Sequence, residues 1–184
     1  MIVMINGSFG VGKTTVARLV HDAFPRSAIY DPEWAGICLM RLPKWIKLKG
    51  SGTDDFQDID LWRRSAIMGT RLFRFFVSGP VIVPMTFTDR VYYDEVVKGL
   101  RAIDPELRVF CLTASLVTVK KRLAGRGTEN SGSDTDWISR RIQECAEAHR
   151  DPHFGELVDT EELTANEVAE EIVKRLHRPG AASC

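Results

Sequence analysis

A glycine-rich segment near the start of the chain limits its possible folds more than any other feature. It reads Gly7-Ser8-Phe9-Gly10-Val11-Gly12-Lys13-Thr14-Thr15 and fits the phosphate-binding pattern G-x-x-x-x-G-K-[ST]. An apolar run at 2–5 precedes it, and apolar residues at helical spacing follow it from Val16 onward. We therefore expect a buried strand, a glycine loop and a helix in that order, with residues 7–15 binding the nucleotide.

Each part of this P-loop segment has a chemical role toward a polyphosphate. The glycines let backbone N–H groups turn toward phosphate without a Cβ in the way, and the following helix adds the positive end of its dipole. The Lys13 ammonium is expected to neutralise the β- and γ-phosphates, and the Thr14 hydroxyl to bind Mg²⁺. A chance glycine-rich turn is the alternative, but the motif and both flanking elements agree.

Composition excludes several classes of function. The 184 residues suffice for one domain, which we predict at 1–178 with a disordered tail at 179–184. The net charge of zero gives no general attraction to nucleic acid. No apolar stretch reaches the ~20 residues that span a bilayer, and the start of the sequence, with no basic residues and no cleavage site, leads us to expect no signal peptide. The four cysteines form no C-x-x-C pair, which argues against a zinc or redox motif and favours the cytoplasm.

Strand-like and helix-like segments alternate along the chain, which indicates a parallel sheet with helices on both faces. Strands are predicted at 2–5, 28–30, 81–87, 109–112 and 157–158. Helices are predicted at 33–40, 61–77, 92–103 and 115–123. A further helix is predicted to include 138–146, where apolar residues recur on one face, and a final helix begins at the capping box at 164–167. Pro84 is expected at the carboxyl end of its strand because it cannot donate to the ladder. The polar, glycine-rich segment 125–136 is predicted to be a mobile lid loop.

Six segments together carry a family resemblance. They are Ile5-Asn6-Gly7 through Thr14, Tyr30-Asp31-Pro32-Glu33, Asp55-Phe56-Gln57 with Leu61-Trp62-Arg63, Ile82-Val83-Pro84-Met85-Thr86, Lys121-Arg122-Leu123 and Asp159-Thr160. The chain resembles the small P-loop kinases of the shikimate, gluconate, adenylate and chloramphenicol kinase type. Within them it is most similar to the tunicamycin-resistance protein family, because the general kinase families lack the segments at 30–33 and 83–86.

The resemblance implies a P-loop α/β fold with three layers, α/β/α, and a five-stranded parallel sheet in the order 2-3-1-4-5. It also implies a protein that binds ATP with Mg²⁺ and is linked to resistance against tunicamycin, a nucleoside antibiotic with a sugar–lipid body. Phosphorylation of the drug and simple sequestration are both compatible with the motifs. The oligomeric state stays open.

The resemblance also implies roles for individual residues near the nucleotide. Asp31 is expected at a strand end beside the P-loop, where it accepts the proton of the acceptor hydroxyl or holds Mg²⁺ through water; alternatively it only caps the helix that begins at Pro32. Arg122 and Arg126 match an R-x-x-x-R pattern at the lid edge, in which one arginine stacks near adenine and the other clamps phosphates. Two solvated arginines at a helix end are the alternative. The residues that join the P-loop in the cofactor site are Arg122, Asp159 and Thr160, and the catalytic set is Lys13, Asp31 and Arg126.

Glu33, Trp62, Arg63 and Thr86 are the residues expected, with Asp31, to bind the acceptor. The chain departs from many P-loop proteins at Thr86, where a metal-linked Asp is common. Asp89 is close by but is expected to start the next helix. The pair His149 and His153 is not expected to bind metal, because Pro152 interrupts the helix that would align it.

The leading function is transfer of the ATP γ-phosphate to a hydroxyl of a nucleoside- or sugar-like compound. One alternative is an ATP-binding drug sequestrant with little turnover, which the missing strand-end Asp favours. Another is a metabolic nucleoside or sugar kinase. A GTPase is a weaker alternative because the chain has no N-K-x-D segment.

Overall fold

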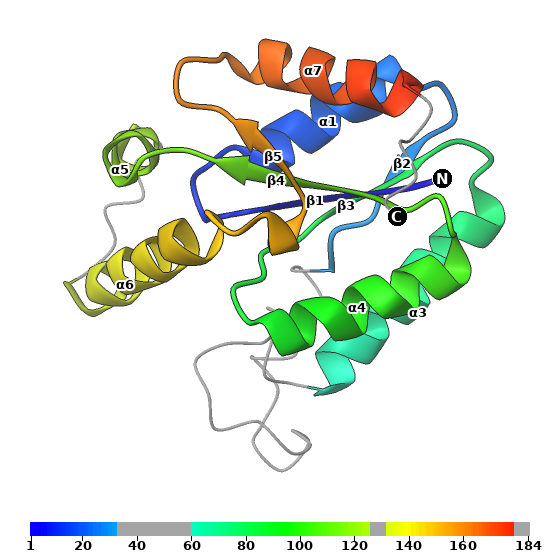
Figure 1. The fold of residues 1–184 in the computed structure, drawn as a ribbon, viewed down its shortest axis with the longest axis horizontal. Helices are drawn as coiled ribbons and strands as arrows, with labels where there is room; N and C mark the ends of the chain where they lie inside the picture. Colours follow the sequence, from blue (N-terminus) through cyan, green and yellow to red (C-terminus); the bar gives the residue numbers. More distant parts are fainter. Residues whose placement is uncertain (33–59, 126–131, 179–184) are drawn as a thin grey trace.

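The computed structural model describes residues 1–32, 60–125 and 132–178, with the backbone alone at 132–139. Its centre is a five-stranded sheet in the order β2-β3-β1-β4-β5 (Figure 1). Every ladder between neighbouring strands is parallel. The strands are β1 Ile2–Gly7, β2 Ala28–Ile29, β3 Val81–Pro84, β4 Arg108–Thr113 and β5 Glu156–Asp159. Both the predicted α/β fold class and the predicted strand order are confirmed.

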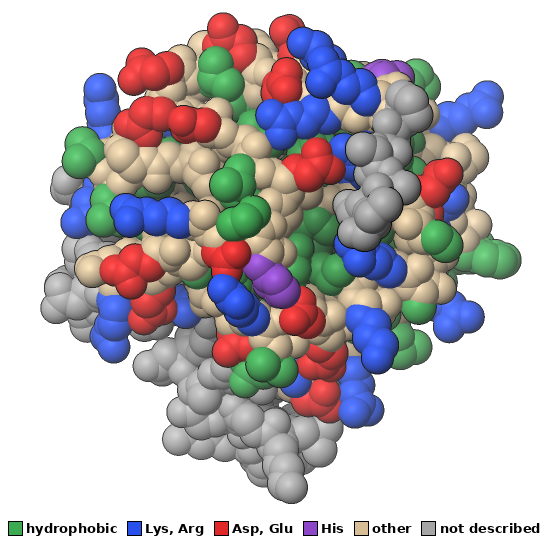
Figure 2. Space-filling model, viewed as in Figure 1, with side chains coloured by type: hydrophobic (Ala, Val, Ile, Leu, Met, Phe, Trp, Pro, Cys, Tyr) green, Lys and Arg blue, Asp and Glu red, His purple; other side chains and the backbone are tan. Residues whose placement is uncertain are grey.

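Helices cover both faces of this sheet, as Figure 1 shows, with α1 and α7 on one face and α3 and α4 on the other. In chain order the helices are α1 Lys13–Ala23, α3 Asp60–Phe76, α4 Arg90–Ile103, α5 Leu116–Ala124, α6 Gly132–Ala148, the short 3₁₀ turn η2 Pro152–Phe154 and α7 Ala165–His177. None of the helices in the described ranges has the length and apolar character needed to cross a membrane. Acidic and basic side chains are interspersed over the face of the molecule drawn in Figure 2.

The central strand β1 is buried along its whole length and supplies both cores. Ile2 and Met4 pack against α3 and α4 with Trp62 and Phe87, whereas Val3 and the alternate positions pack against α1 and α7. Successive side chains of a strand point to opposite faces, so a continuous apolar run is what a sheet covered on both sides requires.

The expected position of Pro84 at the end of β3 and the predicted starts of α4, α5 and α7 are confirmed, each with the local chemistry expected from its residues. Pro84 is the last residue of β3, where its missing N–H costs no ladder bond. Asp89 caps α4 by accepting from the N–H groups of Val91 and Tyr92, and Ser115 caps α5 by accepting from Thr118 N. The predicted capping box is also present, with Thr164 and Glu167 satisfying each other at the start of α7.

The predicted lid loop at 125–136 is wrong in its second half, because α6 begins at Gly132. Helix propagation is cooperative, so the amphipathic turns around Ile142 and Cys145 extend the helix through a segment whose composition alone favours a loop. Residues 126–131 lie outside the described residues. The same is true of the predicted helix at 33–40 and the predicted tail at 179–184.

A close contact between Tyr30, which follows β2, and Gly69 of α3 gives a stability prediction. A Cβ at Gly69 would overlap the ring and hydroxyl of Tyr30, whose hydroxyl donates to Ser65 O at 3.1 Å. Alanine favours a helix over glycine by about 1 kcal/mol, yet this overlap should dominate and Gly69→Ala should destabilise the protein by about 1–3 kcal/mol in urea unfolding. In a Tyr30→Leu background the same change should cost clearly less. An equal cost in both backgrounds would rule out the Tyr30 contact as the cause.

Candidate functional site

The P-loop joins β1 to α1 through glycines with left-handed or extended backbone. Gly10 and Gly12 have φ values of 80° and 112°, conformations that residues with a side chain rarely adopt. No atom lies within 4 Å of the place where a Cβ of Gly12 would be, so this side of the loop is open. Gly12 is the N-cap of α1, and no side chain caps the helix there. The N–H groups of the first turn are therefore directed at an open space that suits an anion.

Lys13 lies across the loop rather than out in solvent. Its Nζ donates to Ser8 O at 3.2 Å, and it lies 5.4 Å from the centre of the Phe9 ring. The side chain is almost buried, while Thr14 and Thr15 are exposed at the start of α1. A cation held at the mouth of a helix N-terminus adds to the positive field there, which fits a polyphosphate.

Asn6 supports the P-loop from the carboxyl end of β1, a role that the sequence pattern does not reveal. It is fully buried, and its Oδ1 accepts from Gly7 N and from Phe87 N, both at 2.9 Å. Its Nδ2 donates to Phe154 O at 3.5 Å. One amide thus links the carboxyl end of β1 to the chain that follows β3 and to η2. The available signal was a single polar residue at the end of an apolar strand.

Arg122 connects α5 to the P-loop and to the end of β5. Its Nη1 donates to Val11 O at 3.2 Å and to Thr160 Oγ1 at 3.0 Å, and its Nη2 donates to Thr160 O at 2.6 Å. Thr160 is buried and also donates to Thr113 O. The structure thus brings Arg122 and Thr160 to the P-loop, as the cofactor prediction requires. In this state the guanidinium bonds protein oxygens, so stacking on adenine or clamping phosphate stays a prediction. Arg126 lies outside the described residues.

A carboxylate not foreseen from the sequence closes the neighbouring turn. Glu161 accepts from Ser115 N at 2.6 Å, from Ser115 Oγ at 2.9 Å and from Thr118 Oγ1 at 2.6 Å. These bonds, the one from Ser115 N first, lower the pKa of Glu161. The predicted Asp159 accepts from Glu161 N at 2.9 Å and fixes the same turn. The carboxyl ends of β4 and β5 are therefore joined around the start of α5.

Asp31 follows β2 on the other side of β1 and is half-buried. The sequence placed it directly beside the P-loop, but β3 lies between β2 and β1 in the sheet. Two strand spacings amount to about 10 Å, so β2 does not adjoin the P-loop strand, and contact of Asp31 with an acceptor hydroxyl or a hydrated Mg²⁺ stays a prediction. Thr86 is buried at the end of β3, between these two positions. Glu33 lies outside the described residues.

Trp62 and Arg63 have structural contacts that the sequence did not indicate. Trp62 is fully buried, donates from Nε1 to Pro32 O at 2.8 Å and packs with its ring centre 5.9 Å from that of Phe87. A ring in this position has no open face on which a ligand could stack. Arg63 pairs with Glu95 on α4 at 2.7 Å and lies 4.3 Å above the Tyr92 ring. Trp62 therefore belongs to the packing of α3 against the sheet, whereas binding of the acceptor by Arg63 stays a prediction.

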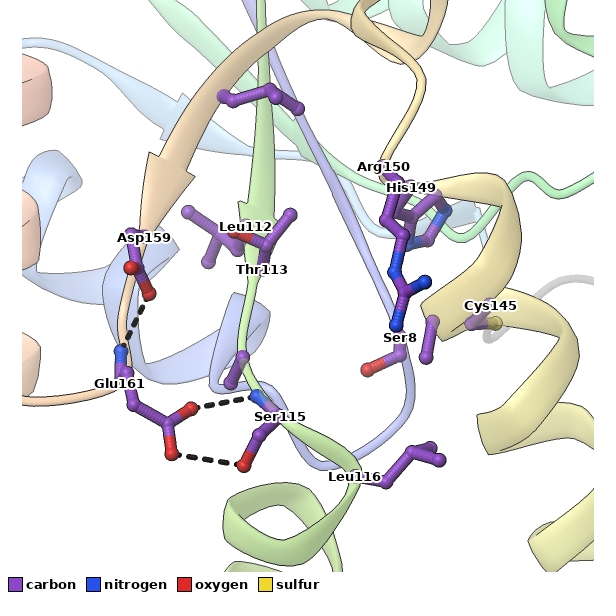
Figure 3. Close-up of a pocket in the computed structure, with 13 residues that line it drawn as sticks. Ser8, Leu112, Thr113, Ser115, Leu116, Cys145, His149, Arg150, Asp159 and Glu161 are labelled. Atoms are coloured by element: carbon purple, nitrogen blue, oxygen red, sulfur yellow. Dashed lines mark hydrogen bonds between the residues drawn. The ribbon is translucent and has the colours of Figure 1, made fainter.

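A cleft of about 740 Å³ opens beside the P-loop, over the carboxyl ends of β4 and β5 (Figure 3). Residues from these strand ends, from the start of α5 and from the end of α6 line it, and Ser8 of the P-loop lies at its base. Figure 3 shows Asp159 and Glu161 on one wall and His149 and Arg150 on the other. The predicted nucleotide residue Asp159 lies in this cleft, which no local sequence pattern indicates.

His149 anchors the end of α6 to the strand end of β3. It is buried, and its Nε2 lies 2.7 Å from Phe87 O, so Nε2 carries the proton and donates to that carbonyl. Burial lowers the pKa of His149 to about 4, against the small opposing effect of this bond. Within the described ranges, no three histidine, cysteine or acidic side chains gather in a way that would hold a metal ion.

This pKa predicts a pH-dependent stability. The unfolded chain takes up a proton at His149 near the ordinary histidine pKa of 6.5, whereas the folded chain does so only near pH 4. Stability is therefore full above pH 6.5 and falls as the pH is lowered from 6.5 to about 4. One such group contributes a slope of at most about 1.4 kcal/mol per pH unit. Urea unfolding between these limits should show a shallower slope for His149→Gln than for the exposed control His177→Gln. Equal slopes would contradict the assignment.

Comparisons with known proteins agree with this geometry. A family model described as an AAA domain matches residues 2–152. The structure of the tunicamycin resistance protein of Deinococcus radiodurans superposes with a TM-score of 0.73 and 28% identity, over 97% of this chain and 96% of that one. No curated protein sequence matches the chain significantly.

Two kinases share the fold at lower identity. The gluconokinase of Sinorhizobium meliloti 1021 gives a TM-score of 0.62 at 22% identity, over 95% of this chain and 90% of that chain. The shikimate kinase of Bacteroides thetaiotaomicron gives 0.63 at 14% identity, over 97% and 99% respectively. The resemblance to small P-loop kinases and to a tunicamycin resistance protein is therefore confirmed, and the two kinases support the fold alone.

Proposed function

The chain belongs to the AAA-domain family, and from this premise we propose that it transfers the γ-phosphate of ATP to a hydroxyl of a nucleoside- or sugar-like compound. We place this activity in tunicamycin resistance and in the cytoplasm. The likeness to the Deinococcus protein over nearly the full length of both chains supports the setting.

The observation that carries the proposal is the open phosphate cradle at the start of α1. Gly12 leaves space at the helix N-terminus, and Lys13 is held across the loop by Ser8 O. These groups fit the triphosphate of ATP, and Thr14 in the first turn is the hydroxyl that would bind Mg²⁺. Mg²⁺, when bound, neutralises charge that develops on the transferred phosphoryl group.

Asp31, which follows β2, is proposed to orient the acceptor hydroxyl. In the sheet, β3 separates β2 from the P-loop strand β1. Phosphoryl transfer requires little of a base beyond orienting the attacking hydroxyl, and Asp31, half-buried after β2, is the carboxylate proposed to do so. Arg122 keeps the P-loop backbone and the β5 end together through Val11 O and Thr160. Arg126 is proposed to contact the transferred phosphate.

A binding-only protein is the second candidate, and Thr86 is the observation that favours it. The chain from Val81 to Thr86 contains no acidic residue at the strand end, and the next one, Asp89, is used as the cap of α4. Such a protein would hold ATP and drug with little turnover. A third candidate, a metabolic kinase for a sugar-like compound, is favoured by the shared fold with gluconokinase and shikimate kinase.

Mass spectrometry of tunicamycin after incubation with the protein, ATP and Mg²⁺ separates these candidates. The proposal predicts a drug species that has gained one phosphate, in proportion to the ADP formed. Unchanged drug that co-purifies with the ATP-bound protein would support sequestration. Unchanged drug that does not bind, together with ADP formed on a panel of sugars and nucleosides, would support the metabolic kinase.

A further inference from the structure

We propose that the outer face of α3 binds an amphipathic helix of another protein, one whose apolar stripe is flanked by acidic side chains. This interaction surface is an additional property of the chain and does not depend on phosphotransfer. It rests on a row of exposed apolar side chains along α3, on two arginines beside that row and on the scarcity of acidic residues in this helix.

Large apolar side chains form a row along the solvent side of α3, a helix of the outer layer that lies beside α4 (Figure 1). The row consists of Leu61, Met68, Leu72 and Phe75, with exposed fractions of 42%, 71%, 58% and 82%. Spacings of seven, four and three residues place these side chains on one side of the helix, over a length of about 20 Å. A contiguous apolar surface of this kind favours association, because a partner that covers it releases water.

Phe76 widens the row at its C-terminal end. It is 75% exposed, and its ring meets that of Phe75 edge to face, with the ring centres 5.1 Å apart. Aromatic side chains offer a large contact area and are common anchors of protein interfaces. The core side of α3 is occupied separately, since Trp62 and Ala66 are fully buried in the core that packs against the sheet. The exposed row is therefore a second apolar face of the same helix.

Two arginines flank the row on one side. Arg64 and Arg71 are seven residues apart and each lies three or four residues from members of the row. Arg71 is exposed, and in the described part of the chain no hydrogen bond or ion pair engages it. Arg64 pairs with Asp60 at 3.0 Å, but both side chains reach solvent, so a partner carboxylate can replace this contact. After Asp60, α3 contains no acidic residue. A partner on the row therefore meets positive charge, which acidic flanks would complement.

Charge argues against two other occupants of the row. In an antiparallel pair of α3 helices related by a twofold axis, both copies would place Arg64 and Arg71 along the same edge, so like charges would meet. An anionic membrane attracts a basic surface, but the chain has zero net charge, and Asp94 and Glu95 lie on the neighbouring helix α4. A narrow row with a seven-residue repeat instead fits the side chains of a single partner helix.

Fluorescence anisotropy with two labelled synthetic peptides tests the role of charge. One peptide is a helix with a leucine stripe flanked by glutamates, and the other has lysine in place of each glutamate. The intact protein should bind the glutamate peptide at least about tenfold more tightly than the lysine peptide. In an Arg64→Glu, Arg71→Glu variant this preference should reverse. The control Arg101→Glu, at an exposed position of α4, should change it less than about twofold.

The apolar row is tested with the double variant Met68→Ser, Leu72→Ser, which should weaken binding of the glutamate peptide at least about fivefold. Val117→Ser is the matched control, because Val117 is 77% exposed on α5, and it should change binding less than about twofold. Methyl NMR of the native protein requires no variant to fold. The glutamate peptide should shift the methyl signal of Met68 and leave those of the buried Met4 and Met85 in place.

Equal affinities for the two peptides, native affinity in the Met68→Ser, Leu72→Ser variant, or shifts confined to other methyl groups would each overturn the proposal. Sedimentation examines the other two occupants. A native dimer that this variant dissociates would assign the row to a second copy, and binding to phosphatidylglycerol vesicles that this variant abolishes would assign it to a membrane; either result would also overturn the proposal. None of these outcomes depends on whether the chain transfers phosphate.

Discussion

Replacing Asp31 by asparagine should reduce phosphotransfer by ~10²-fold or more while ATP affinity stays within a few-fold of the native value. The amide keeps the shape of the side chain but removes the negative charge and the basicity that orient the acceptor hydroxyl. Because β3 separates β2 from β1, Asp31 lies too far from the P-loop strand to contribute directly to the phosphate cradle. Initial rates of ADP formation with acceptor, together with calorimetric ATP binding, provide both values.

Asp22→Asn is the matched control, since Asp22 is an exposed carboxylate on α1. It should leave both turnover and ATP binding unchanged. If Asp31→Asn retains native turnover, Asp31 does not orient the acceptor and only caps the segment that begins at Pro32. A parallel loss of ATP binding and of turnover would instead mean that Asp31 supports the nucleotide site.

Replacing Lys13 by alanine should weaken ATP binding by about an order of magnitude or more. The change removes a charge-assisted contact of ~1.5–3 kcal/mol with the polyphosphate, and it releases Ser8 O, which the ammonium holds at 3.2 Å. Calorimetry with ATP and Mg²⁺ measures the loss. Because Lys13 is nearly buried, circular dichroism and urea unfolding must show that the variant is folded.

Lys98→Ala removes an exposed lysine from α4 and is the matched control for lost charge. It should bind ATP like the native chain. A folded Lys13→Ala variant with native ATP affinity would show that the nucleotide phosphates do not bind at this loop.

The architecture could be predicted from the sequence because local signals and long-range packing agree. The motif at 7–15 specifies a strand, a loop and a helix, and Asp89, Ser115 and Thr164 mark helix starts by their capping side chains. Continuous apolar runs predict strands buried on both faces. The strand order followed from the family resemblance, since periodicity does not order parallel strands.

The features that the sequence does not predict depend on contacts between segments that are distant in the chain. Tryptophan is a residue type on which ligands can stack, but the packing of α3 places the Trp62 ring in the core beside Phe87. The three bonds of Asn6 join residues up to 148 positions apart, which no local pattern reveals. The start of α6 differs from the prediction because a downstream amphipathic face can extend a helix across a polar segment. The cleft over β4 and β5 arises from four separate parts of the chain.

The most direct test of the proposed phosphotransfer is to follow the γ-phosphate itself. The protein is incubated with Mg²⁺, tunicamycin and ATP labelled with ¹⁸O in the γ-phosphate, and the drug is analysed by mass spectrometry alongside ADP. The account predicts that the labelled phosphate appears on the drug, one for each ADP formed, and that Asp31→Asn slows this appearance by ~10²-fold. Drug that is bound by the ATP-loaded protein but never acquires the label would contradict it.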